Sequence, residues 1–377
     1  MRGNEYEVRI EANDGRGDRV SLGTEVAGAS GSAGEPTADQ GGSPTLGAPA
    51  HNDLRWIDML TRREALLVGA GVVVGARVVC AKAAQPETVV NFDVPAGACD
   101  CHTHIFGDAK QFPLFSGRVY TPETASPEEM SALHRALHMQ RVVIVTPSVY
   151  GTDNSASLYG IKARGETARG VAVIDDKTPD SALDAMNRAG FRGIRINLTT
   201  VGQSDASLGR RRFQGSVDRA KSRNWHIQMY VNLAMVSAIK DLVQASPVPV
   251  VFDHFGGAQA AQGLQQPGFA DLVDLVRSGK AYVKISGAYR ASTQAPDYAD
   301  VAPLAKALIA ANVDRIVWGS DWPHPNSTTP EGHRVTEVTP LFQIDDGRML
   351  NQLAVWAPDA GTRKKILVDN PARLYGF

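Results

Sequence analysis

The sequence predicts one α/β domain over residues 91–377, a TIM-type (β/α)8 barrel. Short apolar runs alternate there with polar loops and stretches of helical periodicity, the pattern of repeated βα units. An open doubly wound sheet would favour a glycine-rich phosphate loop after its first strand, and no such loop follows the first run. Eight runs are present, enough to close a barrel: residues 98–104, 141–146, 170–174, 192–197, 226–231, 248–254, 281–286 and 314–320.

Helix-like segments follow most of these runs. A predicted helix over residues 126–139 begins with Ser126-Pro127-Glu128-Glu129, where the serine can cap the first turn and proline suits its first position. Another, over residues 181–189, ends before Gly190, and glycine is the residue type that most often terminates a helix.

Polar residues gather where the predicted strands end. Catalytic groups of TIM-type barrels lie at the carboxyl ends of the strands, so we expect a site there. The residues at these positions are His104, Ser148, Asp175, Asn197, Tyr230, His254, Arg290 and Asp321.

The first run ends with two histidines, His102 and His104, that are one residue apart. Alternate side chains of a strand share a face, so both rings can grip one metal ion or one carbonyl oxygen. Asp321 ends the eighth run, within Gly319-Ser320-Asp321-Trp322-Pro323-His324. The three residues together predict an active site.

Five motifs, taken together, resemble those of the amidohydrolase-related hydrolases. They are Asp-x-His-x-His at residues 100–104, Phe-Asp-His-Phe-Gly-Gly at 252–257, Val-Lys-Ile-Ser-Gly at 283–287, the Gly-Ser-Asp-Trp-Pro-His segment at 319–324 and Asn-Pro-Ala-Arg-Leu-Tyr-Gly at 370–376. The similarity covers about residues 94–377 and is strongest to the branch that contains 2-pyrone-4,6-dicarboxylate lactonase. It implies a barrel of the metal-dependent-hydrolase type.

The resemblance also implies a hydrolase that opens a carboxylated lactone or a related cyclic ester. Asp321 would be the general base that takes a proton from water. His102, His104 and His254 would polarise the scissile carbonyl. The implied substrate is a small anionic lactone.

Substrate anchoring is expected from residues that match the lactonase pattern. Arg195 and Arg290 match arginines that bind substrate carboxylates, and Tyr230 and Ser148 match its hydrogen-bonding residues. A further arginine expected shortly after Arg195 is missing, because residues 198–202 read Leu-Thr-Thr-Val-Gly. We therefore expect a substrate with one carboxylate, or an acidic sugar lactone, to be preferred over a dicarboxylate.

The metal requirement has two interpretations. His102, His104 and Asp321 can hold one zinc ion, as a metal-dependent decarboxylase of the same superfamily would require. The runs at 193–197 and 228–231, however, offer no lysine or histidine as a further ligand. The resemblance to the lactonase branch, which works without metal, implies that no metal is essential. A non-catalytic binding barrel is a third reading, which the complete histidine and aspartate set disfavours.

Composition is that of a globular enzyme. The chain has 377 residues, 43% hydrophobic residues and a formal net charge of -1, which gives no electrostatic basis for binding nucleic acid. Of the three cysteines, Cys99 and Cys101 should be buried thiols.

Several other polar residues are expected to have no catalytic role. We expect solvent exposure for His134 and His138, which lie four residues apart on a predicted helix, and for the three arginines at 210–212. We expect His226 and His324 to be structural or at the pocket rim.

The first ninety residues have a different character. Residues 1–58 are rich in Gly, Ala, Ser, Asp and Glu and predict a disordered or untranslated extension. Residues 59–90, from Met59, resemble a twin-arginine export signal: Arg62-Arg63, a weakly apolar stretch and the small residues that would precede a mature start near Ala84. The stretch is too short and broken to anchor in a bilayer. A periplasmic or secreted location is expected, with a cytoplasmic one as the alternative; the oligomeric state is left open.

Overall fold

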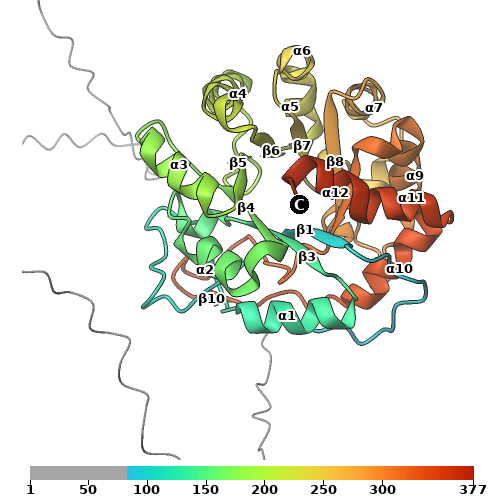
Figure 1. Cartoon of the computed structure of the whole chain (residues 1–377), viewed down its shortest axis with the longest axis horizontal. Helices are drawn as coiled ribbons and strands as arrows, with labels where there is room; N and C mark the ends of the chain where they lie inside the picture. The colour runs from blue at the N-terminus through green and yellow to red at the C-terminus, as the bar shows by residue number, and fades with distance from the viewer. Residues whose placement is uncertain (1–82) are drawn as a thin grey trace, which may run out of the picture. The chain divides into compact units, whose positions relative to one another are not determined.

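The computed structural model describes residues 83–377 and confirms the predicted (β/α)8 barrel (Figure 1). Eight parallel strands form one sheet in the order β1-β3-β4-β5-β6-β7-β8-β9, and the helices surround it. Each predicted run overlaps one of these strands, although β4 begins two residues before its run and β5 one residue before its run. The strands are β1 (Cys99–Thr103), β3 (Arg141–Val145), β4 (Ala168–Ala172), β5 (Phe191–Asn197), β6 (His226–Tyr230), β7 (Val250–Phe252), β8 (Ala281–Ser286) and β9 (Ile316–Gly319).

The barrel closes between its first and last strands. Beyond β9 the chain runs alongside β1, with a parallel bridge between Thr103 and Trp322. The backbone amide of Asp321 donates to the His102 carbonyl at 2.9 Å, and the amide of His104 donates to the Trp322 carbonyl at 2.9 Å. These bonds fix the backbone of Asp321 beside the two histidines.

The helices follow the strands as expected. The start of α1 is a capping box, in which Ser126 Oγ accepts from the Glu129 amide at 3.3 Å and the Glu129 carboxylate accepts from the Ser126 amide at 2.8 Å. The helices are α1 (Pro127–Ala136), α2 (Ser155–Arg164), α3 (Asp180–Arg188), α4 (Ala206–Ala220), α5 (Leu233–Ala238), α6 (Lys240–Ala245), α7 (Phe269–Arg277), α8 (Ala288–Ala291), α9 (Ala302–Ala311), α10 (Asp346–Trp356), α11 (Ala360–Lys364) and α12 (Asn370–Tyr375).

A separate apolar cluster fills the barrel interior. Cys99 and Cys101 of β1 pack there against Val143, Val251 and other strand residues, as predicted for buried thiols. Leu374 and Tyr375 of the C-terminal helix α12 belong to the same cluster, and α12 lies across the ring of strands (Figure 1). The C-terminal helix therefore closes the end of the barrel that is opposite the carboxyl ends of the strands.

An irregularity in β1 sets the direction of the two site histidines. The pairing of β1 with β3 changes register between Asp100 and Thr103. Cys101 packs in the interior cluster, and the next residue, His102, also faces the interior, where it contacts Lys284. A bulge of this kind re-aims side chains, and strand alternation alone does not predict it.

The predicted extension and residues 59–82 of the predicted export signal lie outside the described residues. Residues 83–90 are described, and they are tied to the barrel: Trp322 Nε1 donates to the Ala84 carbonyl at 3.2 Å, and the Thr88 amide donates to Asp345 Oδ2 at 3.1 Å. Among the described residues, no helix combines the length and the apolar character needed to cross a bilayer.

The expectation that His134 is solvated was wrong. Its side chain is buried between α1 and its neighbours, where Nδ1 accepts from Arg164 at 2.6 Å and Nε2 donates to Asp100 at 3.3 Å. Burial lowers the pKa of this histidine. His138, in the turn that follows this helix, is exposed as predicted. Helical spacing predicts that the two histidines share one face. It does not predict that His134 contacts the buried Asp100.

Buried neutral histidines should make the protein sensitive to mild acid. Burial lowers the pKa of His226 to about 3, and neither ring nitrogen of this residue has a hydrogen-bond partner among the described residues. Below about pH 6.5 the unfolded chain binds a proton at His226, whereas the folded chain does not. Protonation therefore favours the unfolded state, and the free energy of unfolding decreases as the pH falls below about 6.5. Between pH 7.5 and 5, His226 should account for about 2 kcal/mol of lost stability.

The measurement is urea unfolding at both pH values. His226→Leu should show a smaller loss on acidification than the wild type, whereas His138→Asn, at the exposed histidine, should match the wild type. Equal pH dependence in His226→Leu and wild type would contradict a neutral buried His226.

Candidate active site

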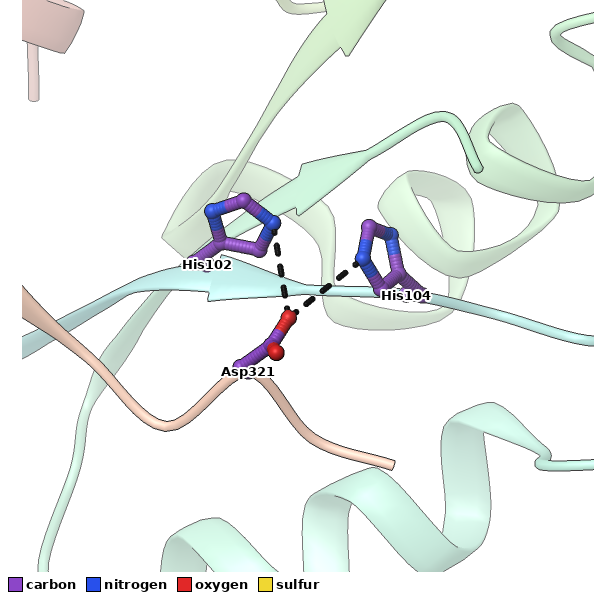
Figure 2. A group of neighbouring side chains, drawn as sticks. All are labelled: His102, His104 and Asp321. Atoms are coloured by element: carbon purple, nitrogen blue, oxygen red, sulfur yellow. Dashed lines mark ion pairs between the residues drawn. The ribbon is translucent and has the colours of Figure 1, made fainter. Parts of the chain in front are cut away.

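Asp321 lies just after β9, where the backbone turns sharply. Its φ of 69° is in the left-handed region, which is uncommon for a residue other than glycine and is often found at functional sites. The turn directs the carboxylate toward the two histidines of β1 (Figure 2). Oδ1 lies 3.6 Å from His102 Nε2 and 3.6 Å from His104 Nε2. The three residues singled out from the sequence are therefore brought together by the fold.

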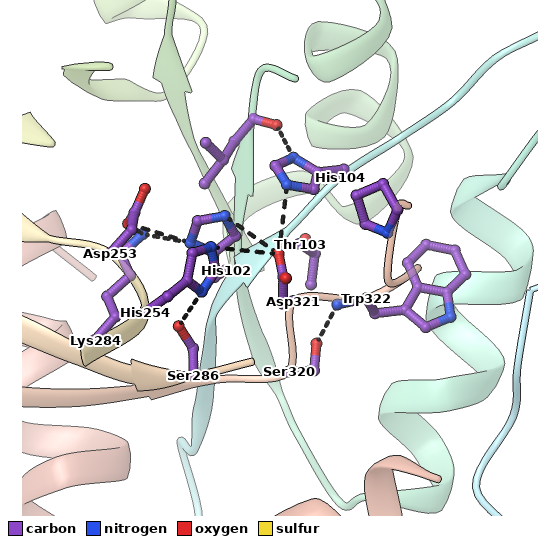
Figure 3. A network of polar contacts seen from close by, with 12 residues as sticks. His102, Thr103, His104, Asp253, His254, Lys284, Ser286, Ser320, Asp321 and Trp322 are labelled. Carbon is purple, nitrogen blue, oxygen red and sulfur yellow. Dashed lines mark hydrogen bonds and ion pairs between the residues drawn. The ribbon is translucent and has the colours of Figure 1, made fainter. Parts of the chain in front are cut away.

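His254 completes this arrangement from the other side. It follows β7, also with a left-handed backbone (φ 47°), and its Nε2 lies 3.7 Å from the same Asp321 oxygen (Figure 3). Its Nδ1 lies 2.9 Å from Ser286 Oγ, which fixes the ring orientation. Burial lowers the pKa of His254 to about 4, so the ring is neutral at pH 7. The imidazole nitrogens of three strand-end residues thus converge on one carboxylate oxygen.

A glycine leaves room for this convergence. Gly287 has a φ of 57°, and a Cβ atom there would lie 3.1 Å from His254 Nδ1 and 3.2 Å from Asp321 Oδ2. A side chain at this position would therefore strain the backbone and crowd both functional groups.

The second oxygen of Asp321 is occupied by α8. Arg290 Nε donates to Oδ2, and the Tyr289 hydroxyl donates to the same oxygen at 2.6 Å. Burial opposes the charge, but the Arg290 guanidinium holds the pKa of the Asp321 carboxyl well below its usual range. Asp321 is therefore ionised, and Oδ1, which has no hydrogen-bond partner among the described residues, is the oxygen directed at the histidines.

Below the histidines, a buried charged network lies inside the barrel. Lys284 of β8 lies 3.4 Å from Asp253 Oδ1, and Gln228 Nε2 donates to Asp253 Oδ2 at 3.0 Å. Arg195 Nε lies 3.6 Å from the same carboxylate. No role for Lys284, Asp253 or Gln228 was predicted from the sequence. A lysine inside the apolar run of β8 was the available signal, because a buried charge is costly unless it is paired.

All eight predicted catalytic and substrate-binding residues are assembled at the carboxyl ends of the strands. The pocket is lined by His104, His254 and Asp321 together with the four predicted substrate-binding residues Ser148, Arg195, Tyr230 and Arg290, and His102 lies beneath them. Tyr120, Pro325 and Ser327 also line it, from loops that sequence analysis did not implicate. These loops are joined by a short pair of strands, β2 (Thr121–Pro122) and β10 (Val338–Thr339).

The pocket is small and is flanked by two larger clefts. Its volume is about 10 Å³, too little for a lactone ring. A cleft of about 720 Å³ shares Ser148, Arg195 and Asn197 with it, and one of about 420 Å³ shares Tyr230, His254 and Arg290. The Pro325 carbonyl, on a loop that lines the small pocket, accepts from Arg290 Nη2 at 3.2 Å.

Other predicted polar residues lie outside the pocket. His324 is buried and pairs with Asp346 at 2.8 Å, so it is structural. Asp175 lines the 720 Å³ cleft instead of the pocket. Arg210 pairs with Asp241 at 2.6 Å on the surface, while the exposed Arg211 and Arg212 line the same cleft as Asp175.

Two groups of side chains have ligand atoms close enough together to hold a divalent cation. The ligand atoms of His102, His104 and Asp321 lie within 4.8 Å of one another, as do those of His102, Asp253 and His254. His102 Nε2 and Asp321 Oδ1 are buried and have no hydrogen-bond partner among residues 83–377. Nitrogen and carboxylate ligands of this kind suit zinc.

Comparison with known proteins adds independent information. Residues 99–377 match the family described as Amidohydrolase. The chain is 34% identical over 287 residues to 4-sulfomuconolactone hydrolase of Rhizobium radiobacter, covering 76% of this chain and 92% of the relative. It is 33% identical over 293 residues to 2-pyrone-4,6-dicarboxylate hydrolase of Comamonas testosteroni, covering 75% and 92%. A solved structure of a candidate 2-pyrone-4,6-dicarboxylic acid hydrolase from Pseudomonas putida superposes with a TM-score of 0.61 at 30% identity, covering 76% of this chain and 98% of that one.

Proposed function

Because the chain belongs to the amidohydrolase family and is a hydrolase with lactone-hydrolysing relatives, we propose that it opens an anionic lactone by general-base catalysis. One observation carries this proposal: the Nε2 atoms of His102, His104 and His254 surround Asp321 Oδ1 at 3.6, 3.6 and 3.7 Å in a buried pocket. The carboxylate can receive a proton. In the same small volume, a neutral imidazole that carries its proton on Nε2 can polarise a carbonyl.

The reaction can be written with Asp321 as the proton carrier. Asp321 Oδ1 accepts a proton from water as the water oxygen bonds to the lactone carbonyl carbon. The Nε2–H groups of His102 and His254 stabilise the negative charge that develops on the carbonyl oxygen. Neutral His104 donates through Nδ1 to the Val145 carbonyl at 2.7 Å and therefore presents a lone pair on Nε2. The ring C–O bond then breaks, and the proton passes from Asp321 to the leaving oxygen. The product is a ring-opened hydroxy acid or its keto tautomer, with no net proton left on the enzyme.

The charge of the site favours an anionic substrate. Three buried or nearly buried cations, Arg195, Lys284 and Arg290, face two buried carboxylates, Asp253 and Asp321, which leaves one positive charge in excess. A carboxylate or sulfonate on the substrate would balance it. Both of the relatives compared above are named for lactones or pyrones that carry acidic groups.

Metal-dependent decarboxylation is a second candidate reaction, favoured by the convergence of His102, His104 and Asp321. A divalent ion held by these three residues would supply a Lewis acid for a substrate oxygen. The two reactions have different products. A carboxylated lactone that consumes base and releases no carbon dioxide indicates hydrolysis, whereas stoichiometric carbon dioxide release would contradict it.

Arg195 should act mainly in substrate binding. It lines the pocket without contacting Asp321, so Arg195→Ala should raise KM for a monocarboxylated lactone by about ten- to a hundredfold while kcat falls less. Arg290→Ala should lower kcat as well, because Arg290 holds the proposed base. Steady-state kinetics on paired mono- and dicarboxylated lactones measure both effects.

Arg212 provides the control for this comparison. It lines the neighbouring cleft and not the pocket, so Arg212→Ala should leave the kinetics with a monocarboxylated lactone unchanged. The contrary result would be a wild type that prefers the dicarboxylated lactone and an Arg212→Ala variant that loses this preference. This result would show that Arg212 replaces the arginine that is missing near Val201. That result would contradict the proposed specificity for a single carboxylate.

A further inference from the structure

Lys284 is a fully buried lysine directly below the site. Its ammonium has three N–H groups, and three polar side-chain atoms lie near it. Figure 3 shows two of these neighbours, His102 and Asp253. Gln228 Oε1 lies at 2.7 Å, His102 Nδ1 at 3.3 Å and Asp253 Oδ1 at 3.4 Å. Lys284 is not among the residues that line the pocket, so it acts on the site through its neighbours.

The contact with His102 determines where that ring carries its proton. His102 Nδ1 lies 3.3 Å from Lys284 Nζ and 3.3 Å from Asp253 Oδ1. An ammonium can only donate and a carboxylate can only accept, so a neutral imidazole can satisfy one of them through Nδ1 but not both. The lysine contact has the geometry of a hydrogen bond, whereas Asp253 Oδ1 has no hydrogen-bond partner among the described residues.

The choice of partner changes what His102 presents to the pocket. If Nδ1 accepts from Lys284, the proton is on Nε2, and an N–H group points toward Asp321 Oδ1 and the position of a substrate carbonyl. If Nδ1 donates to Asp253, Nε2 has a lone pair and can bind a metal ion. Metal-bound histidines commonly donate their other N–H to a carboxylate in this way. Lys284 and Asp253 therefore favour opposite forms of one ring.

We propose that Lys284 is a positioning residue that keeps the proton of His102 on Nε2, so that this histidine acts as a hydrogen-bond donor instead of a metal ligand. The excess of buried positive charge around the histidines supports the same assignment, because it disfavours a divalent cation. The inference depends on the proposed function only where it names a lactone carbonyl as the acceptor.

The test uses Lys284→Met, which removes the donor while retaining an unbranched side chain. In protein labelled with ¹⁵N-histidine, the wild-type His102 should show an unprotonated Nδ1 and a protonated Nε2, assigned by comparison with His102→Gln. In Lys284→Met the two signals should exchange, because Asp253 becomes the only partner of Nδ1. Zinc affinity, measured by calorimetry, should rise by about ten- to a hundredfold. Lys280→Met, at an exposed lysine just before β8, should change neither measurement.

Three outcomes would overturn the inference: a protonated Nδ1 in the wild type, zinc bound to His102 Nε2 in the wild type as purified, or unchanged His102 signals in a folded Lys284→Met variant. The wild-type spectrum decides the question even if the variant fails to fold. A wild type with a protonated Nε2 but without lactone turnover would contradict the proposed function and leave this inference intact.

Discussion

Replacement of Asp321 by asparagine should lower turnover by about a hundredfold or more while the protein remains folded. The amide keeps the size of the carboxylate and a hydrogen-bonding oxygen, but it cannot take a proton from water at neutral pH. Loss of a general base typically costs about a hundred- to ten-thousandfold in rate. Turnover of a carboxylated lactone, followed by base uptake, measures the effect, and circular dichroism and thermal unfolding verify the fold.

Asp205→Asn is the matched control for this variant. Asp205 caps α4 after β5, at the same end of the barrel, and asparagine caps a helix as well as aspartate does. Its turnover should equal that of the wild type. The loss of a general base should cost at least about a hundredfold in rate. An Asp321→Asn variant that retains more than about a tenth of wild-type turnover would therefore exclude Asp321 as the base.

Removal of the carboxylate of Asp253 should strongly destabilise the fold. Asp253→Ala leaves Lys284, which is fully buried, and Arg195, which is nearly so, without their shared anion. Breaking a buried ion pair by deleting one partner typically costs about 3 to 5 kcal/mol. Urea unfolding at pH 7.5 should show a decrease of this size in the free energy of unfolding.

A surface ion pair gives the comparison. Arg210 and Asp241 lie 2.6 Å apart but are largely exposed, so water solvates either charge when its partner is removed. Asp241→Ala should therefore leave the urea midpoint nearly unchanged. If Asp253→Ala were as stable as Asp241→Ala, the charges of Lys284 and Arg195 would have to be compensated by other groups, and the buried network would not have the role described for it.

Much of the site was predictable because strand ends are local features of the sequence. Apolar runs bounded by polar loops located all eight strands, and the residues that follow them include His104, His254 and Asp321. In a closed parallel barrel, strand ends meet at one mouth whatever the details of packing. The mutual approach of these three residues therefore followed from the fold class.

The sequence by itself determined the barrel and the set of residues at its mouth, because both depend on periodicity within short segments. Tertiary structure alone decided the partners of those residues. Arg290 holds Asp321, Lys284 lies between Asp253 and His102, and Asp100 accepts from a histidine that helical spacing had placed in solvent. Such pairings join residues that are distant in sequence. They depend on strand register, on the register shift in β1 and on which side chains are buried next to one another. A buried charge must find a partner, but only the packed barrel determines which partner is within reach.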